Sequence, residues 1–231
     1  MQAQIWLLWA RPSRKPRNKI VMEKIIDFFL EPYYSRATYL IILEAIAFVF
    51  GIASVIYAKN RNILVYPTGL IATTITVYLF LYDELMGDMM MNFYYSVMSI
   101  YGWWNWARKK NGSPVVPVSR TNKKEKFIGF GMFVLTMLVT YVVYKAYGSV
   151  IEFTNYIDIF TSGLFFTAMW FMANKKLENW TLWIIADIIT VPLYAYRGWG
   201  MLSLQYLIFT ILAVQGYIAW KKHLNNNLQT A

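Results

Sequence analysis

Cysteine is absent from the 231 residues, and histidine occurs once, as His223 near the C-terminus. Without cysteine the chain can form no disulfide, no thiolate metal site and no cysteine nucleophile. The single histidine is accompanied by no H-E-x-x-H or G-x-S-x-G arrangement, and no glycine-rich phosphate loop is present. These absences argue against an enzyme and against direct use of ATP, and we expect neither a metal nor a cofactor.

Charged residues are also scarce, at 15% of the chain, whereas a soluble domain of this size carries roughly 25%. Hydrophobic residues make up 58%, and the charges form short clusters between apolar blocks of about 20 residues, the length that crosses a bilayer. The sequence therefore predicts an all-α integral membrane protein embedded in a lipid bilayer. The net charge of +10 does not indicate a nucleic-acid partner, because the basic residues occupy loops between the blocks.

Seven apolar blocks have the length of a membrane span. They cover approximately residues 40–58, 63–81, 89–107, 127–147, 156–173, 180–196 and 201–220. Residues 1–19 are expected to be flexible, and their apolar stretch precedes their basic run, the reverse of a signal peptide. Met22 is a candidate for the true start. Residues 20–36 are amphipathic but too short and too charged to span, so we expect a helix lying in the membrane interface.

Basic residues follow every odd-numbered block. The loops concerned hold Lys59 and Arg61, then Arg108 to Lys126, then Lys175 and Lys176, and finally Lys221 and Lys222. The alternate loops hold the acidic residues Asp83, Glu84, Asp88 and Glu152, and Arg197 alone among basic residues. Because basic loops stay in the cytoplasm, we expect the N-terminus outside and the C-terminus in the cytoplasm. The basic run before residue 20 speaks against this orientation, but it lies farther from a span.

The two halves of the chain repeat each other. At one constant spacing, residues of the first half match identical residues of the second, in the pairs Ile42 and Ile159, Phe48 and Phe165, Lys59 and Lys176, Asn62 and Asn179, Ile71 and Ile188, and Thr73 and Thr190. Tyr66 then matches Trp183, and after a short gap Gly102 and Trp106 match Gly216 and Trp220. Two three-span units joined by one span have the same orientation, a 3+1+3 arrangement found in small transporters. We place the units at 37–110 and 151–222, with the basic loop and linker helix at 111–150 and a cytoplasmic tail at 223–231.

The block at 180–196 carries the most informative polar pattern. At 100° per residue, one helical face holds Trp180, Trp183, Asp187, Thr190 and Tyr194. A carboxylate at membrane depth is costly unless it faces a cavity or a partner, so this face predicts a binding site. Structural roles remain open for its members: Asn179 is also a good helix N-cap, Trp180 also suits the membrane interface, and Asp187 also suits a bond between helices.

Two further blocks offer polar faces at helical spacing. In the third block Asn92, Tyr95, Ser99 and Trp103 share one side, and in the second block Tyr66 and Thr73 do. Asn92 and Gln205 are amides in apolar helices, where an unpaired amide is costly, so each bonds either a neighbouring helix or a polar substrate. Trp106 and Trp220 lie at block ends beside basic pairs, and we expect them to anchor the helices at the membrane interface. Pro67 and Pro192 are candidate hinges or static kinks.

Several motifs resemble those of the nicotinamide riboside transporter family, PnuC. They are W-x-x-W-x-x-x-D from Trp180, L-Y-x-x-R-G from Leu193, L-Q-Y from Leu204, G-Y-x-x-W-K-K from Gly216 and Y-G-W-W-N-W from Tyr101. The likeness covers about residues 37–222. It implies a seven-span 3+1+3 fold related to the SWEET sugar transporters, a homotrimer, and facilitated diffusion of nicotinamide riboside across the bacterial inner membrane. A cytoplasmic kinase traps the substrate by phosphorylation in that family. Related transporters carry thiamine or riboflavin.

The resemblance fits the chemistry of the polar faces. Nicotinamide riboside has a flat cationic ring, a carboxamide and a ribose, so its site needs an aromatic face together with amide, hydroxyl and acidic groups. The candidate substrate contacts are Trp183, Trp180, Asn179, Asp187, Tyr194, Gln205, Asn92, Tyr95, Ser99, Trp103, Tyr66 and Thr73. The same groups would suit thiamine or riboflavin, and the residues alone do not separate the three. A channel is a less favoured alternative, because nothing resembles a selectivity filter.

Overall fold

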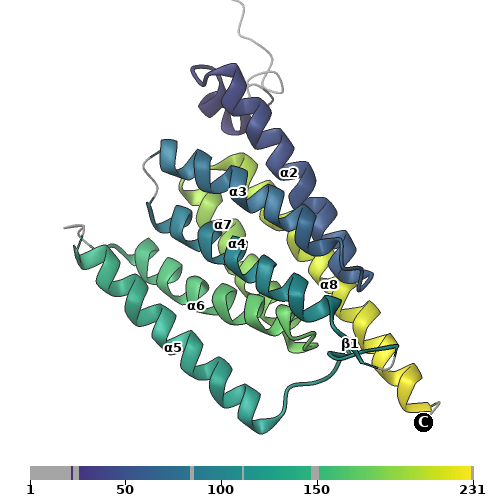
Figure 1. The fold of residues 1–231 in the computed structure, drawn as a ribbon. Coiled ribbons are helices and arrows are strands. Elements are labelled where there is room, and N and C mark those ends of the chain that lie inside the picture. The colour runs from purple at the N-terminus through teal and green to yellow at the C-terminus, as the bar shows by residue number, and fades with distance from the viewer. Residues whose placement is uncertain (1–21, 23–25, 84–85, 111, 147–150, 230–231) are drawn as a thin grey trace, which may run out of the picture.

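The computed structural model describes residue 22 and residues 26–83, 86–110, 112–146 and 151–229. Over these residues the chain forms long helices with one short hairpin (Figure 1). The elements are the 3-10 helix η2 (Glu31–Tyr33), α2 (Thr38–Lys59), α3 (Val65–Tyr82), α4 (Met86–Ala107), β1 (Lys109–Lys110), β2 (Ser113–Pro114), α5 (Lys123–Ala146), α6 (Phe153–Ala173), α7 (Glu178–Tyr196) and α8 (Gly200–Gln229). The prediction of an all-helical protein is confirmed.

Each apolar block lies within one of the helices α2 to α8, give or take a few residues. Five of these, α2, α3, α5, α6 and α8, are long and apolar enough to cross a membrane by length and composition. The helices α4 and α7, which carry two of the polar faces noted above, are not among these five.

Polar caps extend two helices beyond their apolar blocks. At the start of α5, the side chain of Asn122 accepts from the Glu125 amide and the side chain of Glu125 accepts from the Asn122 amide, both at 2.9 Å. Glu152 and Asn155 form the same reciprocal box at the start of α6. The helix α5 thus begins at Lys123, four residues before the block predicted from hydrophobicity. The helix α8 likewise continues past Trp220, through most of what we expected to be a tail.

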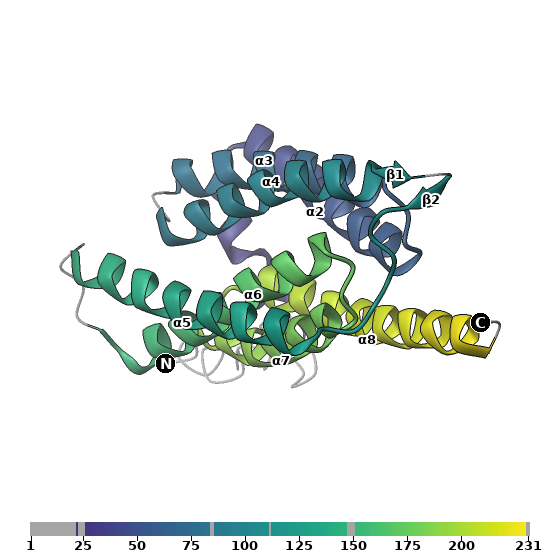
Figure 2. The same ribbon diagram turned by 60° about the horizontal axis from the view of Figure 1, so that its bottom comes forward.

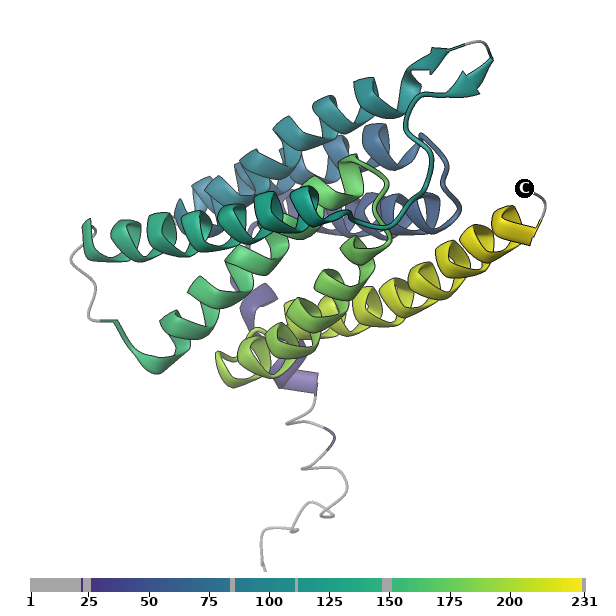
Figure 3. The ribbon, with the colours of Figure 1, turned by 90° about the horizontal axis from the view of Figure 1, so that it is seen from below.

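Six helices close into a ring. The helix α2 packs on α3, α3 on α4, α4 on α6, α6 on α7, α7 on α8, and α8 returns to α2, while α5 lies outside against α6. Figures 2 and 3 show the first three helices as one group and α6 to α8 as another, with α5 flanking the second group. The even-numbered helices run in one direction, so their C-terminal ends gather at one end of the ring together with the lysine-rich loops. We call this the basic end and the opposite one the acidic end.

The two halves correspond in three dimensions, although at a different spacing from the one the sequence suggested. The turn after α2 and the turn after α6 each contain one residue with a left-handed backbone, Arg61 (φ 57°) and Lys175 (φ 50°). The next amide in each turn donates at 2.9 Å, from Asn62 to the Tyr57 carbonyl and from Lys176 to the Phe171 carbonyl. At this same spacing Tyr66 matches Trp180, and Gly102 and Trp106 match Gly216 and Trp220.

The predicted match of Tyr66 with Trp183 is therefore wrong by about one helical turn. Three residues turn a helix by about 300°, so a shift of that size moves a side chain only about 60° around the axis. Apolar blocks consequently align almost as well at either spacing. The turn geometry separates the two, because a left-handed residue occurs at one position in each half.

The segment before α2 rests on the acidic end of the ring. Only residue 22 and residues 26–36 of the predicted interfacial helix fall in the described part, and residues 1–19 lie outside it. Arg36 bonds Asp83 at the end of α3, with Nη2 2.8 Å from Oδ2. A β-carbon on Gly200 would come within 2.6 Å of the Phe28 carbonyl oxygen, so the chain passes close to the start of α8. This contact ties the segment to both halves.

Candidate functional site

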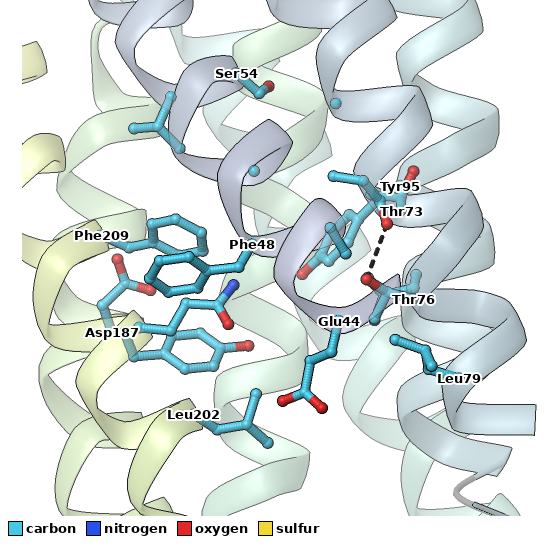
Figure 4. Close-up of a pocket in the computed structure, with 18 of the residues that line it drawn as sticks. Glu44, Phe48, Ser54, Thr73, Thr76, Leu79, Tyr95, Asp187, Leu202 and Phe209 are labelled. Carbon is cyan, nitrogen blue, oxygen red and sulfur yellow. Dashed lines mark hydrogen bonds between the residues drawn. The ribbon is translucent and has the colours of Figure 1, made fainter. Parts of the chain in front are cut away.

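A cavity of about 500 Å³ lies inside the ring, and all six ring helices line it. Figure 4 shows Glu44 and Phe48 of α2, Thr73 of α3, Tyr95 of α4, Asp187 of α7 and Phe209 of α8 around this space. We call it the central cavity. Its wall is largely apolar, with a few polar side chains facing inward, which is typical of sites for small organic molecules.

The helix α7 supplies the polar stripe predicted from the sequence. Trp180, Trp183 and Asp187 all line the central cavity. The Asp187 side chain is 2% exposed, and its Oδ1 has no hydrogen-bond partner among the described residues. The indole nitrogens of Trp180 and Trp183 also lack an acceptor within the described part of the chain. Buried polar atoms are rarely left unpaired, so these groups indicate a place where a polar ligand completes the bonding.

Trp183 has aromatic neighbours on two sides. Its ring centroid lies 6.0 Å from that of Tyr95 on α4 and 5.4 Å from that of Phe165 on α6. At the position equivalent to Trp183 in the first half stands Gly69, which also lines the cavity. The two halves therefore differ at this position, with a large aromatic face in the second half and, in the first, a glycine packed against the Ser54 hydroxyl.

In the first half of the chain, several polar side chains at the site already have hydrogen-bond partners within the protein. Thr73, which is equivalent in position to Asp187, shares a hydrogen bond of 2.7 Å with Ser96. The amide nitrogen of Asn92 donates to the Asp88 carbonyl one turn earlier, at 2.9 Å. Ser99, Gln205 and Tyr66 also line the cavity, and the Tyr66 hydroxyl is buried with no partner in the described residues. The unpaired acid therefore belongs to the second half.

Three of the predicted contacts lie elsewhere. Asn179 is fully buried behind the cavity wall, and its amide donates to the Lys176 carbonyl at 2.5 Å. The alternative that Asn179 caps the helix is wrong, because α7 begins at Glu178 with Leu177 in the cap position. Trp103 is 42% exposed on the outer surface of α4 and does not line the central cavity. Tyr194 lines a second cavity, described below.

The expectation that Trp106 and Trp220 anchor the helices at the membrane interface is wrong. Trp106 is 5% exposed and Trp220 is 0% exposed, and both belong to the core at the basic end of the ring. A tryptophan beside a basic pair suits either the interface or a helix seam. The choice between the two depends on how the helices close into a ring, and the sequence pattern does not show that.

Sequence reasoning gave no binding role to an ionic cluster at the acidic end of the central cavity. Glu44 accepts a hydrogen bond from the Tyr33 hydroxyl, and the Arg36 guanidinium lies between Glu44 (3.8 Å) and Asp83 (2.8 Å). Burial opposes the charge of Arg36, but the hydrogen bond to Asp83 and the charges of Asp83 and Glu44 raise its pKa overall. The signal available in the sequence was Glu44 itself, an ionisable residue within an apolar block.

A second cavity, of about 900 Å³, lies between α4, α5, α6 and α7 toward the acidic end. Asp158 of α6 bonds Arg197 at 2.6 Å and accepts from the Tyr144 hydroxyl at 3.0 Å. The Tyr194 hydroxyl lies 3.5 Å from Asp88. Asp158 is equivalent in position to Glu44, so each half has one carboxylate held by a tyrosine and an arginine. In the second cavity the acidic side chains are bonded to arginine and tyrosine, so fewer of their atoms are free to bind a ligand than in the central cavity.

Comparisons with known proteins agree with this arrangement. The model of a family described as nicotinamide mononucleotide transporter matches residues 41–222. The nicotinamide riboside transporter PnuC of Escherichia coli K12 is 24% identical over 201 residues, and the match covers 77% of this chain and 84% of the relative. The PnuC of Neisseria mucosa is 25% identical over 194 residues, covering 78% of this chain and 72% of the relative.

A relative with another substrate and a solved structure complete the picture. The riboflavin/roseoflavin transporter RibM of Streptomyces davaonensis is 21% identical over 174 residues, covering 74% of this chain and 81% of the relative. A crystal structure of the vitamin B3 transporter PnuC superposes with a TM-score of 0.64 at 22% identity, over 89% of this chain and 88% of that one. The fold is therefore similar to that of a solved vitamin transporter.

Proposed function

The chain belongs to the nicotinamide mononucleotide transporter family, and we propose that it carries nicotinamide riboside across a membrane by facilitated diffusion. The observation that carries the proposal is the unpaired Asp187 carboxylate beside Trp183 in the central cavity. A cation is the ligand that an unpaired buried carboxylate favours, and an aromatic face favours a flat cationic ring. Nicotinamide riboside presents both features in one molecule.

The contacts of the substrate follow from the cavity wall. The pyridinium ring stacks on Trp183 within the central cavity, with Tyr95 at the edge of the stack. Asp187 either balances the positive ring or accepts from a ribose hydroxyl, and Gln205 and Asn92 bind the carboxamide or the ribose. Trp180, Ser99, Tyr66 and Thr73 complete the wall. We assign no direct substrate contact to Asn179, Tyr194 or Trp103, because these residues do not line the central cavity.

The arrangement in the membrane is part of the proposal. We place α2 to α8 as seven spans in a 3+1+3 arrangement, with α5 as the linker and the basic end in the cytoplasm of a bacterial inner membrane. The N-terminus then lies outside and the C-terminus inside. The clustering of the lysine-rich loops at one end of the ring supports this orientation. We further propose a homotrimer, and a cytoplasmic kinase that traps the substrate downstream. The protein itself catalyses no reaction.

Calorimetric titration of the purified protein with nicotinamide riboside, thiamine and riboflavin tests the substrate. We expect the tightest binding for nicotinamide riboside. Riboflavin is the second candidate, because a riboflavin transporter is among the relatives, and thiamine is the third. If riboflavin alone bound, the assignment would move to that branch of the family. A conductance without saturation would instead favour the channel, which the aromatic packing at the basic end of the cavity argues against.

A further inference from the structure

Two tryptophans make reciprocal contacts across the ring at its basic end. The indole nitrogen of Trp106 on α4 donates to the Met172 carbonyl on α6 at 3.3 Å. The indole nitrogen of Trp220 on α8 donates to the Ala58 carbonyl on α2 at 3.0 Å. The helix pairs α4–α6 and α8–α2 are the two seams where one half of the ring meets the other. Each seam is therefore closed by one tryptophan, and each half contributes one donor and one acceptor.

The carbonyls that accept from the two indoles lie at helix ends, where a carbonyl has no helical i+4 amide to bond. Ala58 and Met172 both lie in the last turn of their helices, where carbonyls have no partner further along the helix. Each also accepts, at 2.9 Å, from the amide of the left-handed residue that ends the turn. The local geometry around the two contacts is thus the same in both halves. Such agreement between distant parts of the chain points to a shared role.

A glycine lets each tryptophan helix pack closely on the preceding helix of its own half. A β-carbon on Gly102 would come within 2.3 Å of the Tyr66 ring, and one on Gly216 within 2.7 Å of the Trp180 ring. Each glycine lies about one turn before its tryptophan, on α4 and α8 respectively. A side chain here would push the tryptophan helix away from the preceding helix of its own half. The aromatic ring of the second helix in each half therefore packs directly on the backbone of the third.

The four aromatic rings form a continuous layer beneath the central cavity. The ring centroids of Trp106 and Tyr66 are 5.1 Å apart, those of Trp106 and Trp220 are 6.1 Å apart, and those of Trp180 and Trp220 are 5.6 Å apart. Tyr66 and Trp180 line the cavity, whereas Trp106 and Trp220 do not. The layer therefore separates the cavity from the basic end. A solute in the cavity cannot leave on that side while the layer is intact.

We propose that Trp106 and Trp220 are the gate at the basic end, and that the two indole–carbonyl hydrogen bonds must break for the cavity to open there. This inference rests on the proposed transport function. Two matched bonds on opposite seams allow the halves to separate as rigid groups, because no helix needs to unwind. The two prolines that were candidate hinges or static kinks, Pro67 and Pro192, lie within the continuous helices α3 and α7. We therefore place the opening movement at the two seams and not within a helix.

Chemical labelling tests the gate without any substrate. The chain has no cysteine, so a single Ala213→Cys is the only reactive thiol. Ala213 lines the cavity above Trp220, is 2% exposed, and corresponds in position to Ser99 of the other half. A membrane-impermeant maleimide is added to vesicles of both orientations. Lys222→Cys in a parallel sample shows which vesicles present the basic end, so the result does not depend on the proposed topology.

Trp106→Phe and Trp220→Phe keep an aromatic ring and remove the donor. We expect the double variant to raise the labelling rate of Ala213→Cys from the basic end by at least about tenfold, a shift of about 1.4 kcal/mol in gate equilibrium. Each single variant should have a smaller effect. The matched control is Trp104→Phe on the same helix, where the side chain is 57% exposed, and it should change nothing.

Unchanged labelling in the folded double variant, or an equal increase with Trp104→Phe, would refute the gate. Size-exclusion chromatography separates loss of folding from opening. If the double variant does not fold, the unaltered tryptophans still give a result, since Ala213→Cys must then react far more slowly from the basic end than Lys222→Cys. Equal rates would overturn the proposal. If the labelling results are as expected but the protein binds no nicotinamide riboside, the proposed substrate is rejected and the gate is not.

Discussion

At the scale of single residues, the polar groups that face the central cavity differ between the two halves. Asp187 and Thr73 occupy equivalent positions in the two halves, yet Thr73 bonds Ser96 whereas Asp187 Oδ1 has no partner in the described residues. The equivalent of Trp183 is Gly69. The repeat therefore supplies the scaffold, and its departures from symmetry supply the chemistry. Binding should depend on residues that differ between the halves.

Replacing Trp183 with alanine should weaken the binding of nicotinamide riboside. The loss of a stacking and cation–π contact corresponds to about 1–3 kcal/mol, or about fivefold to more than a hundredfold in Kd. Trp183→Phe should retain much of the affinity because a smaller aromatic face remains. Calorimetric titration of folded variants measures the change, and Trp103→Ala, on the outer surface of α4, is the control. Wild-type affinity in Trp183→Ala would place the site away from α7.

Asp187→Asn separates charge from shape. The two side chains are nearly the same size, so the change removes the negative charge and leaves the cavity as it is. We expect the Kd for cationic nicotinamide riboside to rise about tenfold or more, and the Kd for neutral riboflavin to change by much less. Parallel titrations with both compounds measure the difference. Equal losses for the two compounds would mean that Asp187 acts only as a hydrogen-bond acceptor.

At the scale of helices, close approach at glycine decides how the third helix of each half packs. Gly216→Ala should destabilise the protein by about 1–3 kcal/mol, because its β-carbon would meet the Trp180 ring at 2.7 Å. Gly131→Ala on α5 is the matched control. No atom lies within 4 Å of its β-carbon, and alanine favours a helix by about 0.5–1 kcal/mol. Thermal unfolding in detergent should therefore show a lower Tm for Gly216→Ala and an unchanged or higher Tm for Gly131→Ala.

The helices were predictable from the sequence, whereas the contacts between them were only partly so. Hydrophobic length located seven blocks, and the 3.6-residue period correctly grouped Trp180, Trp183 and Asp187 on one face. Periodicity says which residues share a face, but not how far along the helix the cavity extends. Tyr194 lies on the predicted face but lines the second cavity, and Trp103 is exposed. Trp220 was misread for a related reason, since its partner, the Ala58 carbonyl, comes from a helix far away in the chain.

At the scale of the whole molecule, the ring and its orientation can be tested by reporter fusions. A reporter inserted near Pro117 or fused after Lys222 should read cytoplasmic, and one near Gly87 should read external. The basic loops lie together at one end of the ring, whereas the turn between α3 and α4 lies at the other, which is the reason for this expectation. Alkaline phosphatase and fluorescent protein fusions give opposite signals on the two sides. A cytoplasmic reading at Gly87 would overturn the seven-span arrangement.

The energy source is also a property of the whole ring. Among the described residues no group of three or more His, Asp or Glu side chains is placed to hold a metal ion. The carboxylates Glu44 and Asp158 are each bonded to a tyrosine and lie beside an arginine, which does not favour sodium or proton exchange during transport. We therefore expect exchange of labelled for unlabelled nicotinamide riboside in proteoliposomes to run equally fast with and without sodium or proton gradients. Vesicles without internal substrate should fill only to the external concentration. Accumulation above that concentration under either gradient would contradict facilitated diffusion, and loss of it in Glu44→Gln or Asp158→Asn would identify the coupling carboxylate.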